Sequence, residues 1–330
     1  MAAALLGADA GGALTDPAVS LPAVPVYGFP EAAVRAIGHA AGHAAWVRRE
    51  AGTVPWWSDV DLAAARTIVA AALGTEPGGG WLPAEQAASL AGAFGIPVCR
   101  TLPARTADEA VTAAAELGYP VAVKLGGRSV HKTEVGGVRL GLRGEAEVRD
   151  AFAAVSSAAG SAGEGVVVQP TVQPGLELLV GVNRIDPYPP LVVVGLGGTA
   201  TELLADRTTR LAPLTDRDAA DMLAELRSAP LLTGYRGQPP LAVAAVEELL
   251  LRVGLLAEEV PELAELDLNP VIAAPTGVTA VDVKIRLAPK PRRAPVRVPR
   301  LRQPTTTSVD PREASVRTLA GCPAATVGRT

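Results

Sequence analysis

Hydrophobic and polar positions along the chain switch repeatedly between the spacing of a helix and the spacing of a strand. Segments with apolar residues at helical spacing predict helices, and short apolar runs bounded by glycine or proline predict strands. The predicted helices cover residues 29–49, 61–74, 82–95, 106–118, 145–159, 215–226 and 240–260, the last as one helix or two. The predicted strands cover residues 96–101, 121–125, 138–144, 166–170, 176–183, 191–198, 263–273 and 278–285. This order indicates an α/β protein with a strand-rich middle, not a simple doubly wound sheet.

Polar residues at two predicted helix starts support these boundaries. Thr106, three residues before Glu109, has the spacing of a capping box, and Gly118 is a typical helix end. Thr215 is the expected cap of the helix that follows it.

The amino-acid composition of the chain changes at both ends. Residues 1–25 are rich in alanine, glycine and proline and predict a loose lead-in. Residues 284–304 carry eight basic residues and no acidic one, and the remainder to Thr330 has no clear period. Such a basic, proline-rich tail predicts disorder, with contact to nucleic acid as a minor alternative.

Composition excludes several classes of protein. The net charge of -4 gives no reason to expect nucleic acid at the body of the chain, and no apolar run approaches the length of a membrane span. Cys99 and Cys322 are too few for a disulfide framework, so a reducing cytoplasm is expected. The apolar N-terminus lacks a basic start and contains Asp9, so it does not predict a signal peptide.

The segment VAVKLGGRSVHKTEVGGV at 121–138 carries the most informative chemistry. Lys124 lies in a short apolar strand, and Gly126 and Gly127 begin a loop that also contains Arg128 and Lys132. Glycines let backbone N–H groups approach an anion, and the cations neutralise it, so the segment predicts a phosphate contact for Lys124. The alternative is a strand lysine that faces solvent.

His131 lies in the same loop, where an imidazole can bind a phosphate or accept a phosphoryl group; the alternative is loop packing. His39 and His43 have the i, i+4 spacing of metal ligands, but no third ligand is near them in the sequence, so we expect a surface or interface role.

Oxygen-bearing side chains gather near the end of the predicted fold. Asp267 and Asn269 alternate with leucines and are therefore expected on one face of a strand, and Asp282 has the same setting in the next strand. Carboxylate and amide oxygens suit a partly hydrated Mg²⁺. The alternative is that these polar side chains simply face solvent on an antiparallel pair of strands.

A second glycine turn, GLGGTATELLADRTTR at 195–210, is followed by Glu202, Asp206, Arg207 and Arg210. An arginine here can clamp a transferring phosphoryl group, and we expect Arg210 to do so. The alternative is a strand–turn–helix junction with solvated charges.

Taken together, these segments resemble one family. GYPVAVKL with HKTEVGGVRLGL, then VVVQPTVQPGLELLVGVNRID, VVVGLGGTATELLADRTTRLAPL, ELDLNPV and VDVKI resemble the ATP-grasp half of the NDP-forming acyl-CoA synthetases. This is the beta-subunit type of acetate–CoA ligase (ADP-forming), related to succinyl-CoA synthetase. The resemblance covers residues 82–288, and 24–46 is similar to the end of the preceding ligase domain of single-chain members. It divides the chain into an N-terminal extension (1–81), an ATP-grasp domain of two subdomains (82–288) and a basic tail (289–330).

The resemblance implies an ATP-grasp fold, built from α+β subdomains with a helical N-terminal extension and with ATP between the subdomains. It implies that Lys124 holds an ATP phosphate beside Gly126 and Gly127, and that Asn269 and Asp282, with Asp267 adjacent, hold Mg²⁺. It also implies an adenine and ribose site formed by Gln169, Thr171, Val172 and Glu177, with Glu202 nearby. His131 matches the histidine of an HK(S/T)D motif proposed to relay the phosphoryl group, although Glu134 replaces the motif's aspartate.

The resemblance also implies a reaction and a partner. The reaction is acid + CoA + ATP giving acyl-CoA + ADP + phosphate. No CoA-binding fingerprint precedes the ATP-grasp region, so a CoA-binding alpha-type subunit is the expected partner, with CoA and a small carboxylic acid as its ligands. The alternative is a non-catalytic nucleotide-binding remnant, as in protein acetyltransferases fused to synthetase-like regions.

Overall fold

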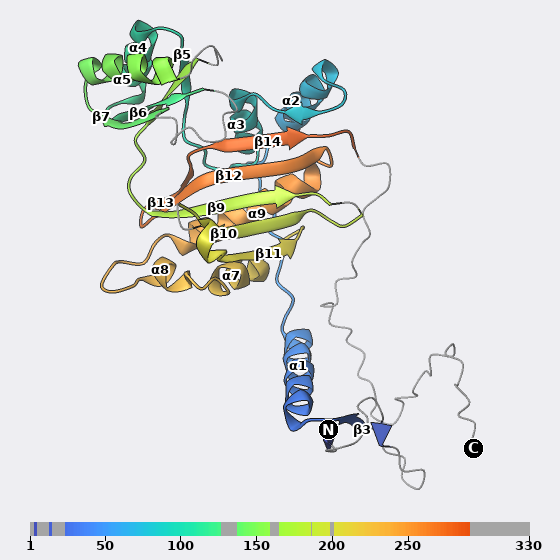
Figure 1. Ribbon diagram of the computed structural model, residues 1–330. Helices are drawn as coiled ribbons and strands as arrows, with labels where there is room; N and C mark the ends of the chain where they lie inside the picture. Colours follow the sequence, from blue (N-terminus) through green and yellow to red (C-terminus); the bar gives the residue numbers. More distant parts are fainter. Residues whose placement is uncertain are drawn as a thin grey trace, which may run out of the picture. The chain divides into compact units, whose positions relative to one another are not determined.

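The computed structural model describes residues 24–126, 137–158, 165–185, 187–198 and 201–290, together with the backbone of two short strands near the N-terminus. The chain forms two compact units (Figure 1). The first contains the described residues up to Ala51, and the second begins at Gly52. The division at residue 81 that the sequence suggested stays a prediction. The predicted tail falls almost entirely on residues 291–330, outside the described residues.

Among its described residues, the first unit has one helix and three short strands. They are β1 (Ala3–Ala4), β2 (Ala13–Leu14), β3 (Val24–Tyr27) and α1 (Pro30–Arg48). Strand β3 is the centre of this sheet, parallel to β1 and antiparallel to β2. The helix predicted at 29–49 is confirmed, with a proline in its first turn. His39 and His43 are exposed on it, and the ring of His43 stacks on that of Trp46.

The smaller sheet of the second unit contains four antiparallel strands in the order β5-β8-β6-β7. These are β5 (Leu102–Ala104), β6 (Val121–Leu125), β7 (Val138–Leu142) and β8 (Val166–Pro170). Helices α4 (Ala107–Leu117) and α5 (Glu145–Ala158) lie together on one side of it (Figure 1). Their alanines and valines form one hydrophobic core with alternate strand residues.

The larger sheet follows the path β11-β10-β9-β12-β14-β4, and β13 pairs with the far end of β12. Its strands are β4 (Gly80–Trp81), β9 (Leu176–Asn183), β10 (Leu191–Leu196), β11 (Arg207–Leu211), β12 (Leu263–Ala274), β13 (Gly277–Ala280) and β14 (Val283–Leu287).

Helices supply the rest of this larger core. They are α2 (Leu62–Thr75), α3 (Ala84–Ala93), α6 (Thr201–Leu204), α7 (Asp216–Ala224), α8 (Ala229–Thr233) and α9 (Val243–Glu259). Residues of α7, α9, α2 and α3 join alternate strand residues in one buried cluster. Because those strand residues alternate, the helix-covered face of the sheet is apolar and the opposite face, which we call the open face, carries the polar residues. In the described part of the chain, no helix is both long and apolar enough to cross a membrane.

Helix starts follow the predicted caps with one difference. Thr215 and Asp218 form a complete capping box at α7. Thr106 accepts a hydrogen bond from the Glu109 N–H, but the Glu109 carboxylate accepts from the Arg105 N–H instead of completing the box.

Two predicted strands are divided in the structure. The run 96–101 makes only an isolated bridge, Val98 with Ala280, and then crosses to the smaller sheet, where pairing begins at Leu102. The run 278–285 is interrupted at Val281 and Asp282, so it forms β13 and β14. In both places an extended segment passes from one set of partners to another, which periodicity within one strand does not reveal.

A linker precedes α2 and is fixed to the helical layer. Thr53 exchanges hydrogen bonds with Asp216 at the start of α7, including Thr53 N–H to the Asp216 carboxylate at 2.8 Å. The buried guanidinium of Arg252 on α9 lies 4.1 Å from the Trp57 ring centroid and 3.0 Å from the Asp59 carboxylate. It also donates to the Phe94 carbonyl at 3.0 Å.

Candidate functional site

Lys124 lies at the contact between the two sheets. Its strand β6 is buried along its whole length, and the residue is only 6% exposed. The Lys124 Nζ lies 3.6 Å from Asp282 Oδ1, in the link between β13 and β14 of the larger sheet. The alternative of a solvent-facing strand lysine is therefore wrong. A buried ammonium needs a counter-charge, and the partner of Lys124 comes from the opposite subdomain.

Asp267 and Asn269 lie beside Asp282. Asp267 on β12 pairs in register with Lys284, and the Asn269 N–H donates to the Asp282 carbonyl at 3.3 Å. The expectation that Asp282 would lie within a strand is wrong, because β13 ends at Ala280 and β14 begins at Val283. The link stays hydrogen-bonded to β12, because the Val281 N–H also donates to the Pro270 carbonyl at 2.9 Å, and it brings Asp282 next to Asn269 and toward Lys124.

A bulge in β12 shapes this site. The strand's pairing with β9 shifts between Leu268 and Val271. Before the shift Leu266 and Leu268 are buried in the core, and after it Val271 and Ala273 are buried. Asn269 and Pro270 together therefore oppose a single β9 residue, Leu179.

The environment of Asp267 disfavours its charge. Burial raises the pKa of the Asp267 carboxyl, Lys284 lowers it in part, and the charges of Glu265 and Asp282 raise it further. Two carboxylates that repel each other at a half-buried point are a site suited to a cation.

The side-chain amide of Gln169, at the end of β8, has a fixed orientation. Its Nε2 donates to the Val281 carbonyl at 3.0 Å and to Thr101 Oγ1 at 2.6 Å. The Thr101 hydroxyl donates its own hydrogen to the Cys99 carbonyl at 3.1 Å, so it must accept from Gln169. The Gln169 Oε1 is buried with no hydrogen-bond partner among the described residues. Sequence reasoning did not single out Thr101, because a lone threonine before a proline-flanked strand carries no signal.

The segment after β8 crosses to the larger sheet and lines a cavity of about 380 Å³. Thr171 and Val172 line it from the crossing segment, and Ile272 lines it from β12. Glu177 is exposed and pairs in register with Ile272, so both side chains project from the same face. Of the predicted adenine and ribose residues, Thr171 and Val172 therefore line this cavity, whereas Gln169 and Glu177 are next to lining residues without bordering it. Cys99, which the sequence did not indicate, also lines it, and burial raises the pKa of its thiol while Lys124 lowers it.

The glycine loop after Lys124 is described only at its ends. The Gly126 N–H donates to the Gly165 carbonyl at 2.9 Å, and the Leu125 N–H donates to the Gly137 carbonyl at 2.8 Å. Gly127 and His131 lie outside the described residues, as does the side chain of Glu202.

Arg210 is not brought to this cluster. It pairs in register with Val192, whose side chain is in the helix-covered core. Its guanidinium lies 2.5 Å from the Glu225 carboxylate at the end of α7. Asp267 and Glu177 project from the opposite, open face, so a catalytic role for Arg210 stays a prediction that this arrangement does not support.

The predicted metal residues fit Mg²⁺ by their chemistry. Among the described residues, no group of three His, Cys, Asp or Glu side chains is placed to hold a metal ion. Mg²⁺ commonly takes only one or two carboxylates and completes its shell with water and phosphate oxygens. Asp282, Asp267 and the amide of Asn269 supply such a partial shell.

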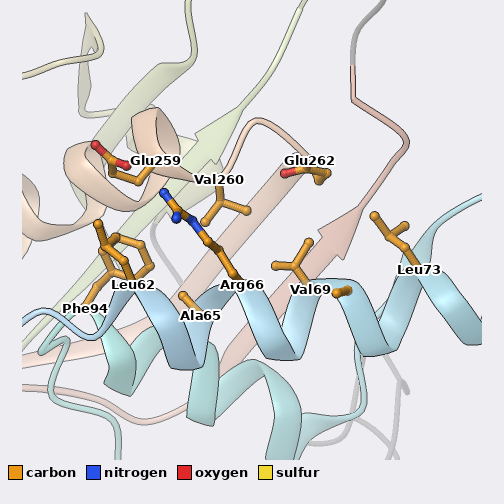
Figure 2. A pocket seen from close by; sticks show the side chains of 10 residues that line it. Leu62, Ala65, Arg66, Val69, Leu73, Phe94, Glu259, Val260 and Glu262 are labelled. Carbon is orange, nitrogen blue, oxygen red and sulfur yellow. The ribbon is translucent and has the colours of Figure 1, made fainter.

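A second cavity, of about 190 Å³, lies away from these residues. It is formed by one face of α2 with Phe94, Val260 and the end of α9 (Figure 2). Its charged lining residues are Arg66, Glu259 and Glu262, and none of the predicted site residues borders it.

Comparison with known proteins agrees with this geometry. Residues 74–287 match the family described as ATP-grasp domain. The chain is 36% identical over 200 residues to the acetate–CoA ligase [ADP-forming] I subunit beta of Pyrococcus furiosus, covering 59% of this chain and 86% of that protein. It is 32% identical over 273 residues to the 4-hydroxybutyrate–CoA ligase [ADP-forming] of Nitrosopumilus maritimus, covering 80% of this chain but only 38% of that protein.

A solved structure is also similar. It is an acetyl-coenzyme A synthetase of Ca. Korarchaeum cryptofilum in complex with coenzyme A and Mg-AMPPCP, with its phosphohistidine segment pointing towards the nucleotide binding site. The identity is 37% and the TM-score 0.60, over 68% of this chain and 99% of that chain. The predicted ATP-grasp fold is thus confirmed, and the chain belongs to the ATP-grasp family of ADP-forming acetate–CoA ligase beta subunits.

Proposed function

We propose that this chain is the ATP-binding component of an ADP-forming acyl-CoA ligase, for the overall reaction acid + CoA + ATP giving acyl-CoA + ADP + phosphate. The observation that carries the proposal is the contact of Lys124 on the smaller sheet with Asp282 on the larger one, at 3.6 Å. A phosphate-binding cation and a metal-binding carboxylate meet beside a cavity lined by Thr171 and Val172. Phosphoryl transfer requires this combination of positioning and charge neutralisation.

Nucleotide binding separates the Lys124–Asp282 pair. Lys124 would then contact the phosphate oxygens, and Asp282, Asn269 and Asp267 would hold Mg²⁺. The ion supplies charge neutralisation to the phosphates. Gln169 positions Val281, and hence Asp282, through its hydrogen bond to the Val281 carbonyl.

His131 is the proposed phosphoryl acceptor. A ring nitrogen of the neutral imidazole forms a bond to the γ-phosphorus while the bond to the β–γ bridging oxygen breaks. The electron pair of the broken bond leaves on ADP, and the other ring nitrogen keeps its proton. The similar Korarchaeum enzyme has a phosphohistidine segment that points towards its nucleotide binding site, so a histidine relay suits this type of enzyme; the assignment to His131 rests on the motif in this chain. Its signature is an acid-labile, base-stable label on His131 from γ-labelled ATP.

The acid and CoA are proposed to bind a separate alpha-type subunit. The Pyrococcus relative is a beta subunit, and this chain spans 86% of it. The longer Nitrosopumilus ligase carries further sequence that this chain does not match. Acyl-CoA formation by this chain with a candidate alpha subunit, compared with this chain alone, tests the assignment and separates it from a regulatory remnant.

The first prediction concerns nucleotide binding. Lys124→Ala should weaken Mg-ATP binding by about 10- to 100-fold, because a charge-assisted hydrogen bond to phosphate contributes about 1.5–3 kcal/mol. Isothermal calorimetry measures the two dissociation constants. Lys290→Ala, at an exposed position just after β14, is the matched control and should bind as the parent does. The proposal is refuted if the folded parent protein binds no Mg-ATP, or if Lys124→Ala binds it with the affinity of the parent.

A further inference from the structure

The open face of the larger sheet carries an arginine that the phosphate site has not yet explained. Thr208 on β11 donates its hydroxyl to the Met222 carbonyl of α7, so it faces the helices. Its neighbour Arg207 therefore projects from the opposite face, as Glu177 and Asp267 do. Arg207 is exposed. Among the side chains that the structure describes, it has no recorded ion-pair partner.

The register of the strands places Arg207 in one row with the predicted metal ligands. Arg207 pairs with Gly195, and Gly195 pairs with Leu179. Leu179 opposes the bulge at Asn269 and Pro270, and Asn269 is bonded to Asp282. Three strand spacings, about 14 Å in all, separate the backbone of Arg207 from that of Asn269.

Glycine keeps this row open. A Cβ at Gly195 would lie 2.8 Å from the Asp206 carbonyl and 3.1 Å from the Arg207 Cβ, so no larger residue fits there without movement. Gly195 therefore places no side chain beside Arg207, so an extended arginine side chain from position 207 can reach over β10 towards Leu179, the next side chain of the row. The arginine side chain spans roughly half of the distance to Asn269, and the gap that remains suits a phosphoryl group.

We propose that Arg207, and not Arg210, is the arginine that contacts the γ-phosphoryl group of the nucleotide. The inference rests on the proposed function, because it requires that the nucleotide lie on this open face. The guanidinium binds the γ-phosphoryl oxygens in a bidentate manner from the β11 side, opposite Asn269 and Asp282. It stabilises the charge on these oxygens as the γ-phosphorus leaves the bridging oxygen, whose electron pair departs on ADP, for the acceptor nitrogen.

Arg210 supplies a matched control from the same strand. It lies three residues from Arg207 but faces the helices, where Glu225 pairs with it. Removal of the Arg210 guanidinium changes the net charge of the protein as much as removal of the Arg207 guanidinium does, but it leaves the open face unchanged.

The test compares nucleotides that differ only in the γ-phosphoryl group. Mg-AMPPCP and Mg-ADP are titrated calorimetrically into the full chain and into Arg207→Ala, Arg207→Lys and Arg210→Ala, with thermal melting to verify folding. Arg207→Ala should weaken AMPPCP binding by about 10-fold or more and leave ADP binding within about twofold. Arg207→Lys should recover part of the loss, and Arg210→Ala should change neither affinity.

Three results would overturn the assignment: an equal loss for both nucleotides, no loss for either, or the γ-selective loss in Arg210→Ala. A parent protein that binds neither nucleotide is a different result, since it refutes the proposed function itself. If Arg207→Ala unfolds, Arg207→Lys alone decides the question, because it keeps the charge but loses the bidentate geometry and should show a smaller γ-selective loss.

Discussion

Asp267 shows how one residue can be unfavourable for folding and favourable for binding. Its carboxyl is half-buried, its pKa is raised by burial, and Glu265 and Asp282 raise the pKa further. A raised pKa means that the folded protein prefers the protonated form, so the ionised form at neutral pH destabilises the fold. The same repulsion is relieved when a cation binds.

We therefore predict opposite effects of Asp267→Asn on stability and on binding. Without ligand, the variant should melt at a higher temperature than the parent at neutral pH. Protonated Asp267 stabilises the folded parent at pH values below the pKa that this carboxyl has in the unfolded chain. This stabilisation is lost as pH rises through the raised pKa that the carboxyl has in the folded protein. The difference between the proteins should thus vanish in acid and grow toward neutral pH.

Melting curves across the pH range, followed by Mg-ATP calorimetry, measure both effects. Mg-ATP binding by Asp267→Asn should be weaker than that of the parent, because the carboxylate oxygen is lost. Glu265→Gln is the comparison, since it removes one repulsion on Asp267 but also the 3.2 Å contact with Arg286, so it should stabilise the protein less than Asp267→Asn does. A less stable Asp267→Asn variant at neutral pH would contradict the electrostatic account.

The sequence singled out candidate site residues but not how they meet. Lys124, Asp267 and Asn269 were found because their polar side chains interrupt apolar runs. The sequence favoured Arg210 as the phosphoryl clamp, because it does not show which face of β11 the helices cover. The amide network of Gln169 was also hidden, since it needs Thr101 and Val281, which lie 68 and 112 residues away.

At the scale of elements, the buried Arg252 joins α9 to the linker and to the end of α3. Its side chain bonds Glu248 at 2.8 Å, Asp59 at 3.0 Å and the Phe94 carbonyl at 3.0 Å, and it stacks on Trp57. The carboxylates can return to water when the guanidinium is removed, but the buried Phe94 carbonyl loses its donor.

Arg252→Ala should accordingly lower the free energy of unfolding by about 2–4 kcal/mol, through the lost hydrogen bonds and the cation–π contact. Urea unfolding followed by circular dichroism measures the change. Arg149→Ala, which breaks the exposed contacts with Glu145 and Asp108, is the control and should unfold at nearly the parent midpoint. Equal unfolding midpoints for the parent, Arg252→Ala and Arg149→Ala would show that the Arg252 network contributes nothing to stability.

Elements with a strong local signal were predicted well. Helix α9 and strands β6, β8 and β9 lie where periodicity placed them, because each keeps one set of neighbours along its whole length. Residues 96–101 and 278–285 were assigned to single strands because both are extended. Their division between partners depends on residues farther along the chain, namely Ala280 and β8 for the first run and the start of β12 for β14.

At the scale of the whole molecule, the second unit contains both hydrophobic cores and every described site residue. In the first unit, Ala33 is the one buried residue of α1. A fragment 52–290 should therefore fold, melt within a few degrees of the full chain and bind Mg-ATP with similar affinity.

A shorter fragment, 62–290, is the matched comparison. It lacks Thr53, Trp57 and Asp59 and hence their bonds to Asp216 and Arg252, so it should melt at a clearly lower temperature than 52–290. Differential scanning calorimetry of the two fragments decides this. A 52–290 fragment that fails to fold, or two fragments of equal stability, would contradict the boundary at Gly52 or the role of the linker.

The β12 bulge at Asn269 and Pro270 has a consequence for inheritance. Because Asn269 and Pro270 together oppose one residue of β9, deletion of either would restore regular alternation and leave Val271 and Ala273 in the core, but it would remove the bulge that lies beside Asp282. A change of length at this point would therefore disturb the predicted metal site while leaving the hydrophobic core in place. Among descendants of this gene, we expect the number of codons between Leu268 and Val271 to stay fixed even where the codons themselves have diverged.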